Sequence, residues 1–201
     1  MTDGTAIRTD RRKVTMLCLC ALFTALTAVG AFIKIPIPYL PITMQTFFTL
    51  LAGMLLGGEL GAVSVGVYVL MGLIGIPVFT EGGGIHYVLK PSFGYLLAFI
   101  IGAFVTGKIA NAKRSPSIQR LLAASFAGMA VIYVIGMAYF FAAKNLWIAG
   151  DGMSVKALFA ACFFPCVPGD VVKCIALALL GQRLIPLTAK YRAGLSASGA
   201  K

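Results

Sequence analysis

The uncharged stretches of the chain set the strongest limit on its fold. The first, residues 14–33, runs for twenty positions without a charged side chain. As an α-helix rising about 1.5 Å per residue, it measures roughly 30 Å, which is the thickness of the hydrocarbon core of a bilayer. It is also longer than the apolar core of a cleaved secretory signal, which reaches roughly 15 residues. The sequence therefore predicts a helix that is retained in a membrane.

Five further apolar runs follow, and the composition agrees with a membrane class. Hydrophobic residues make up 60% of the chain and charged residues 11%, against about 25% charged in a typical soluble domain. We predict an all-α integral membrane protein with six transmembrane helices in a single domain, residues 1–201. Short basic tails cover residues 1–13 and 188–201. The predicted spans are residues 14–33, 42–56, 60–79, 92–107, 121–142 and 168–187.

Two prolines indicate where the last span begins. Residues 156–167 are apolar, but Pro165 and Pro168 interrupt this region. The residue before a proline resists helical backbone angles, whereas proline itself suits the first helical turn. We therefore predict that the last helix starts at Val167 and Pro168.

The basic residues are distributed unevenly between the two sides that six spans create. Twelve of the 17 Lys and Arg residues lie in the N-terminal tail, in the loop between the fourth and fifth spans, and in the C-terminal end from Arg183 onward. Because cytoplasmic segments carry the excess of Lys and Arg, we predict that both termini are cytoplasmic. The loops of the opposite side, together with the start of the last span, then face outward. Their basic residues are Lys34, Lys90, Lys144 and Lys156.

Several function classes are not supported by the sequence. The net charge of +11 comes from residues that flank apolar runs, so no nucleic-acid partner is predicted. The five cysteines contain no C-x-x-C pair and the chain has one histidine, so no metal site is predicted. Residues 102–109 match G-x-x-x-x-G-K, but Ile109 stands where a nucleotide-binding loop needs Ser or Thr. We predict no nucleotide site, no cofactor and no enzymatic activity.

Asp170 and Lys173 are two opposite charges near the start of the last predicted span. Residues three apart lie on one face of a helix, so the two side chains either neutralise each other or serve a ligand. Asp170 also lies where an acid stabilises a helix N-terminus. A charge at mid-bilayer costs roughly 2.5–3.5 kcal/mol on insertion scales, and such residues commonly mark functional sites. We interpret the pair as part of a binding site near the outer end of this span.

Two further regions suggest contacts with a ligand. The loop EGGGIHYVLKPSFGY has three consecutive glycines, which let a backbone approach a ligand closely, although a flexible connector is the alternative. Lys90 in this loop precedes a span, where a lysine can reach toward a pocket mouth. Gln45 lies in an otherwise apolar span. Because a buried amide must be hydrogen-bonded, Gln45 faces either the helix bundle or a ligand.

Small residues at four-residue spacing predict close helix contacts. In the first span, Ala21 and Ala25 have this spacing, and Ala28 lies near the same face. The glycines of residues 53–61 repeat it around the turn between the second and third spans. We interpret the glycines as internal packing. The alanine face packs either within the bundle or against a separate subunit.

Three segments of the chain resemble one known family. They are IPIPYLPITMQTFFTLLAGMLLGGELGAVSVGVYVLMGLIGIPVF, then GGG followed by KPSFGYLLAFIIGAFVTGK, and finally PGDVVKCIALALLG. These segments look like BioY, the biotin-binding S component of energy-coupling-factor (ECF) transporters. The resemblance covers nearly the whole chain and is weakest between residues 112 and 161. Its most specific parts are P-x-P with Q-T-F-F and P-G-D-x-x-K.

The resemblance implies a protein of the prokaryotic plasma membrane that captures biotin from outside. It implies a transmembrane coupling subunit and two ATPase subunits as partners, so that ATP is hydrolysed elsewhere. Solitary transport by a homo-oligomer is the alternative. The family's A-x-x-x-A face is associated with docking to the coupling subunit, and here it corresponds to Ala21 and Ala25, with Ala28 beside them.

Biotin also suits the charged pair, because its ureido group has two N–H donors and a carbonyl and its tail ends in a carboxylate. The resemblance associates the P-G-D-x-x-K acid and base with this ligand, so Asp170 is expected to accept from the ureido group. Either Lys173 or Lys90 then meets the carboxylate, and aromatic side chains pack around the rings. The predicted substrate-binding residues are Asp170, Lys173, Lys90, Gln45, Tyr39, Phe79, Tyr87 and Tyr95.

Two other functions compete with biotin capture. One is an S component for another small vitamin. The other is a membrane enzyme or assembly factor that uses Asp170 and Lys173 chemically, which predicts turnover of a ligand and not its recovery unmodified.

Overall fold

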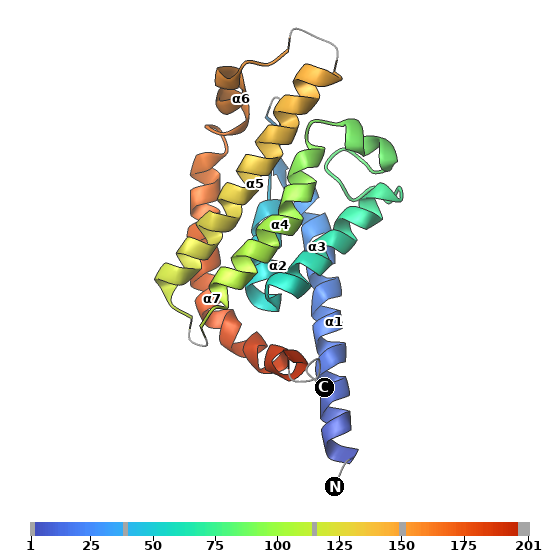
Figure 1. Ribbon diagram of the computed structural model, residues 1–201, viewed down its shortest axis with the longest axis vertical. Coiled ribbons are helices and arrows are strands. Elements are labelled where there is room, and N and C mark those ends of the chain that lie inside the picture. The colour runs from blue at the N-terminus through green and yellow to red at the C-terminus, as the bar shows by residue number, and fades with distance from the viewer. Residues whose placement is uncertain (1–2, 38–39, 114–115, 149–151, 197–201) are drawn as a thin grey trace.

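Helices account for nearly all of the regular structure in the computed structural model (Figure 1). The structure describes residues 3–37, 40–113, 116–148 and 152–196, and within them the side chains of residues 12–192 apart from Lys190. The elements, in chain order, are α1 (Asp3–Phe32), β1 (Lys34–Ile35), β2 (Ile42–Thr43), α2 (Gln45–Leu56), α3 (Gly58–Leu73), the 3₁₀ helix η1 (Ile85–Leu89), α4 (Phe93–Ala110), α5 (Ile118–Leu146), α6 (Val155–Cys162) and α7 (Val167–Ser196).

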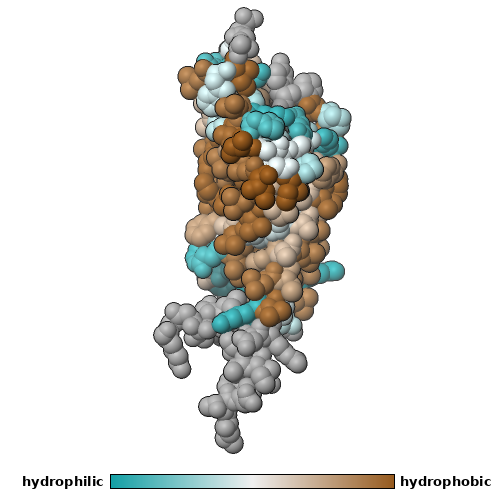
Figure 2. Space-filling view, turned by 90° about the vertical axis from the view of Figure 1, so that its right-hand side faces the viewer, coloured by the Kyte–Doolittle hydropathy of each residue, from teal (hydrophilic) through white to brown (hydrophobic). Residues whose placement is uncertain are grey.

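Four helices in the described part of the chain are long and apolar enough to cross a membrane. They are the segments Arg12–Phe32 of α1, Phe93–Ala110, Ile118–Leu146 and Val167–Ala189 of α7. Helices α2 and α3 are apolar but shorter, with 12 and 16 residues. Figure 2 shows the result on one face, where a broad belt of hydrophobic side chains separates two ends that carry hydrophilic ones. The predicted all-α membrane class is therefore confirmed.

Helix α2 is the most deeply buried element of the bundle. Nine of its 12 residues are buried, and it packs against α1, α3, α4 and α7. A helix that is apolar around its whole circumference has no face to offer to water. The sequence from Gln45 to Leu56 has this character, which places the helix at the centre with its N-terminal end pointing toward the η1 side of the molecule (Figure 1).

Glycine lets α2, α3 and α4 approach to backbone contact. A methyl group added to Gly53 would collide with the backbone of Ala103, and one added to Gly61 would collide with Gly53 itself. Gly107 on α4 is equally close to Gly53 and Gly58. The glycines of residues 53–61 therefore serve internal packing, as predicted, because small residues let helices approach closely.

Helix α7 begins at Val167, as the two prolines predicted. Its C-terminal part turns away from the direction of its first part (Figure 1). Pro186 lies inside the helix, and an interior proline removes a backbone donor and kinks the helix. The turn carries the end of α7 beneath the α2–α3 connection.

Three predicted boundaries differ from the structure. The second span was expected from residue 42, but Ile42 pairs with Ile35 in an antiparallel β1–β2 hairpin, and the helix starts at Gln45. The third was expected to reach residue 79, but α3 ends at Leu73, and Gly75 has a positive φ of 107° that continues no helix. Residues 156–167, expected only as an apolar region interrupted by proline, contain most of the short helix α6, which ends at Cys162 before Pro165.

Candidate ligand-binding site

A cavity lies among α2, α4, α5 and the start of α7, on the side of the bundle where the hairpin and η1 lie. Counted out to its open mouth, the space measures about 620 Å³. Its polar lining includes Thr43, Gln45, Thr46, Tyr95, Tyr133, Asp170 and Lys173, and its apolar lining includes Leu40, Leu96, Phe99, Met129 and Ile132. This mixture of an apolar wall and a few converging polar groups is typical of a binding pocket.

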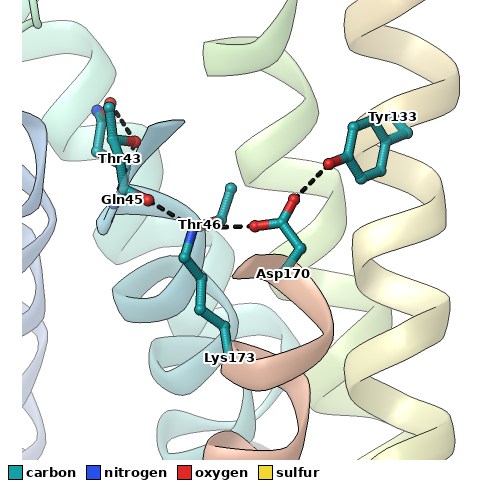
Figure 3. A network of polar contacts seen from close by, with 6 residues as sticks. All are labelled: Thr43, Gln45, Thr46, Tyr133, Asp170 and Lys173. Carbon is teal, nitrogen blue, oxygen red and sulfur yellow. Dashed lines mark hydrogen bonds and ion pairs between the residues drawn. The ribbon is translucent and has the colours of Figure 1, made fainter. Parts of the chain in front are cut away.

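Asp170 and Lys173 form an ion pair inside this cavity (Figure 3). Lys173 Nζ lies 2.9 Å from Asp170 Oδ1, and the two side chains are only 11% and 9% exposed. Both belong to the first turns of α7, where positions i and i+3 share a face. The predicted pairing on one face is confirmed, and the pair also lines the cavity. Mutual neutralisation of the two charges and a role in binding a ligand, the two interpretations left open by the sequence, are therefore compatible.

Lys173 also connects α7 to the region before α2. Its ammonium group donates to the backbone carbonyl of Thr43 at 2.7 Å and to the hydroxyl of Thr46 at 3.2 Å. With Asp170, these acceptors satisfy all three N–H donors of the lysine. The lysine thus holds the hairpin and the N-terminal end of α2 against the last helix.

The second oxygen of Asp170 accepts a hydrogen bond from the Tyr133 hydroxyl of α5 (Figure 3). The carboxylate therefore lies between a cation on its own helix and a phenol on a neighbouring one. Tyr133 stacks edge-on with Phe163, with ring centroids 5.0 Å apart. A buried carboxylate that accepts two such bonds is held in one orientation toward the cavity.

Gln45 is only 3% exposed and lines the cavity while facing the bundle. Its amide donates to the hydroxyl of Tyr68 at 2.5 Å, and its carbonyl oxygen accepts from Thr43 at 3.3 Å. Tyr68 in turn donates to the backbone carbonyl of Val78 at 3.2 Å. The amide is thus satisfied by protein groups, as a buried amide must be, and it ties α2 to α3 and to the loop after α3.

Two of the predicted aromatic residues line the cavity. Tyr87 is buried and shares a hydrogen bond with the Thr80 hydroxyl at 3.1 Å. Tyr95 is buried too, and its hydroxyl has no hydrogen-bond partner in the part of the chain that the structure describes. A buried polar atom without a partner is costly, so this hydroxyl, which lies near the Cys162 thiol, is a candidate donor to a ligand atom.

Three other predicted binding residues have different positions. Phe79 is packed between Tyr68 and Tyr87, with centroids 5.6 and 4.6 Å away, and does not line the cavity. Lys90 does not line it either, because its ammonium group pairs with Glu81 at 2.6 Å and lies over the Tyr87 ring. Tyr39 lies outside the described residues.

Tyr133, Thr43 and Thr46 were not predicted, although the first contacts Asp170 and the others contact Lys173. Tyr133 lies 37 residues before Asp170, and α5 contains a second tyrosine, Tyr139, with an equal claim on sequence grounds. The available signal was the requirement that a charge within a membrane must find polar partners. This requirement predicts that Asp170 and Lys173 have polar partners, but it does not identify the residues that supply them.

The alanine face of α1 is open along part of its length. Ala21 and Ala25 are exposed, whereas Ala28 is half-buried against the hydrophobic core. The exposed alanines lie among large exposed apolar side chains, including Leu17, Leu22 and Val29. This surface suits either lipid or another membrane helix.

Comparison with curated proteins places the chain beside transporters of one kind. A protein of Lysinibacillus sphaericus named "Probable biotin transporter BioY" is 44% identical over 177 residues, which cover 88% of this chain and 90% of the relative. A biotin transporter BioY of Thermotoga maritima is 37% identical over 164 residues, covering 81% of this chain and 91% of the relative.

A solved structure shares the fold. The crystal structure of the S-component for biotin from an ECF-type ABC transporter matches with a TM-score of 0.66 and 26% identity, covering 92% of this chain and 94% of that chain. The family model described as the BioY family matches residues 5–190, a range that includes every helix lining the cavity. On this agreement of sequence and fold, the chain belongs to the BioY family.

Proposed function

We propose that this protein captures biotin as the high-affinity S component of an ECF-type vitamin transporter. The observation that carries the proposal is the buried Asp170–Lys173–Tyr133 cluster at the wall of the cavity. The relatives that this chain matches over most of their length are named biotin transporters. A chain of this kind binds its ligand and releases it unmodified, and the energy for uptake comes from partner subunits.

The proposed arrangement in the plasma membrane has six crossings within a single domain. The two short helices α2 and α3 would complete their crossings with the flanking loops, since 12 and 16 residues fall below the roughly 20 that a span requires. The start of α1 and the end of α7 lie at the same end of the molecule (Figure 1), which supports an even number of crossings. The excess of Lys and Arg at that end favours a cytoplasmic position for both termini.

In this proposal Asp170 and Tyr95 meet the polar groups of biotin. The carboxylate accepts from the ureido N–H groups, and the Tyr95 hydroxyl, which has no partner among the described residues, donates to a ligand oxygen. Lys173 donates to the ureido carbonyl or to the biotin carboxylate. Lys90 and Tyr39 stay proposed contacts on the grounds of the sequence alone, while Gln45 lines the wall and Phe79 packs outside the lining.

The experiment that tests the function is mass spectrometry of small molecules released from the purified protein. We expect intact biotin in near-stoichiometric amount, since a capture protein does not convert its ligand. Recovery of a different vitamin would identify an S component for another substrate. Recovery of a chemically altered ligand would instead indicate an enzyme built on Asp170 and Lys173.

For the coupling subunit, Ala21→Trp is expected to abolish complex formation while biotin affinity stays unchanged. The indole would protrude from an exposed position where small residues allow close helix approach. Co-purification with the coupling subunit and two ATPase subunits measures the first effect, and calorimetry measures the second. Ala123→Trp, at an exposed alanine of α5, is the matched control. Undiminished recovery of the complex with Ala21→Trp would remove the α1 face from the proposed interface.

A further inference from the structure

Another cavity, lined by both charged and apolar side chains, lies at the other end of the bundle, near the α2–α3 turn and away from the proposed biotin site. Residues of this turn, of the C-terminal end of α4 and of the part of α7 from Ile185 onward form its lining. Including its open mouth, the space measures about 1980 Å³. The α2–α3 turn and the end of α7, which help to line it, lie toward the end of the molecule where α1 begins (Figure 1).

The lining of this cavity has an excess of positive charge. Among its described side chains are three basic residues, Lys108, Lys113 and Arg192, and one acid, Glu59. Glu59 is already paired, because Lys108 Nζ lies 2.8 Å from its Oε1. Lys113 and Arg192 therefore contribute charge that the lining itself does not neutralise.

Arg192 carries a buried donor without an acceptor. Its Nη1 atom is inaccessible to solvent and makes no hydrogen bond to any residue that the structure describes. The guanidinium group lies against the turn at Gly57, where Nη1 would be 3.6 Å from a Cβ atom on that glycine. A buried cationic N–H group without a partner is costly, and Arg192 also lines the cavity, where an anion would offset the charge of its guanidinium group.

Asn111 and the first residues of α3 add further polar groups to the lining of this cavity. The Asn111 amide is held by bonds from its Nδ2 to the carbonyls of Met54 at 3.0 Å and Gly107 at 2.8 Å. Its Oδ1 is buried and has no donor among the described residues. The first residues of α3, which begins at Gly58, also line the cavity, and the first N–H groups of a helix have no partner within it. The cavity thus offers several donors and one acceptor.

We propose that this cavity binds the phosphate group of an anionic phospholipid. The phosphate would accept from Arg192, Lys113 and the start of α3. A lipid suits the site better than a free phosphate because apolar side chains, among them Leu56, Leu60 and Ile185, lie beside the cations in the same lining. Basic pockets between membrane helices at a membrane surface commonly bind lipid headgroups.

The test is native mass spectrometry of the purified full-length protein titrated with phosphatidylglycerol or phosphatidylcholine. We expect the wild type to retain phosphatidylglycerol preferentially. Arg192→Gln should weaken this binding roughly tenfold or more, because it removes a charge-assisted contact. Lys113→Gln should weaken it about fivefold. Arg183→Gln is the matched control, since Arg183 is an exposed basic residue of the same helix outside the lining.

Folding of the variants is monitored by thermal unfolding with a thiol-reactive dye, which reports exposure of the buried Cys162, Cys166 and Cys174. If Arg192→Gln does not fold, the exposed Lys113→Gln gives the answer alone. Phosphatidylglycerol binding equal to that of the wild type in the folded variants would overturn the proposal.

Two further measurements on the same variants distinguish a lipid from other ligands of this cavity. Inorganic phosphate that protects the wild type but not Arg192→Gln from unfolding, without any preference for phosphatidylglycerol, would assign the site to a free anion. Loss of the coupling subunit from Arg192→Gln with unchanged phosphatidylglycerol binding would assign it to an acidic protein surface. Either result would replace the lipid.

Discussion

Replacing Lys173 by Met is expected to lower the free energy of unfolding by about 3–5 kcal/mol. Met keeps the length of the side chain but leaves the Asp170 carboxylate, only 9% exposed, without its cation. It also removes the bonds from Lys173 to Thr43 and Thr46, which hold the hairpin and α2 against α7. Thermal or denaturant unfolding of the biotin-free protein, followed by dye labelling of the buried cysteines, measures the loss.

The combined variant Asp170→Asn with Lys173→Met is the control for this explanation. It carries no charge at either position, while the Asn side chain still offers an acceptor to Tyr133. Replacing both members of a buried ion pair commonly costs far less than removing one, so the combined variant should be more stable than Lys173→Met alone. Equal instability of the two variants would mean that the ion pair is not the source of the effect.

Asp170→Asn alone is expected to weaken biotin binding by about 1–3 kcal/mol, the range for unpairing a buried polar group. The amide can still accept from Tyr133, but it loses the negative charge that favours the ureido N–H donors. Titration calorimetry on the purified protein measures the affinity. Because Lys173 loses its counter-charge as well, stability should be recorded on the same sample.

Glu81→Gln is the matched control for this prediction. Glu81 is also paired with a lysine, at 2.6 Å from Lys90, but its side chain is 54% exposed and it does not line the cavity. Its loss should leave biotin affinity close to that of the wild type. An affinity of Asp170→Asn indistinguishable from that of Glu81→Gln would exclude Asp170 from the site.

Local features of the sequence account for much of the fold. Apolar length predicted the positions of the helices, since a long uncharged run has few other stable conformations in a membrane. Proline chemistry predicted the start of α7 at Val167, and small-residue spacing predicted the close packing around Gly53. Both depend on backbone sterics that act over a few residues, so neighbouring sequence is sufficient to infer them.

Boundaries that depend on hydrogen bonds between distant segments were less predictable. Ile42 is apolar enough to begin a helix, yet it pairs with Ile35 in the hairpin. The region after Leu73 is apolar as well, but Gly75 turns it back so that Phe79 packs between Tyr68 and Tyr87. Hydrophobicity indicates that such segments are buried but does not indicate in which conformation.

The candidate site likewise has features that the sequence predicts and features that only the tertiary structure determines. That Asp170 and Lys173 lie together on one face follows from a three-residue separation on a helix, which sequence alone reveals. That Tyr133 meets Asp170 across 37 residues, that Thr43 meets Lys173 across 130, and that Lys90 turns to Glu81 instead of the cavity are consequences of tertiary structure. A charge buried in a membrane requires partners wherever it lies, and only the packing of helices from distant parts of the chain selects which side chains supply them.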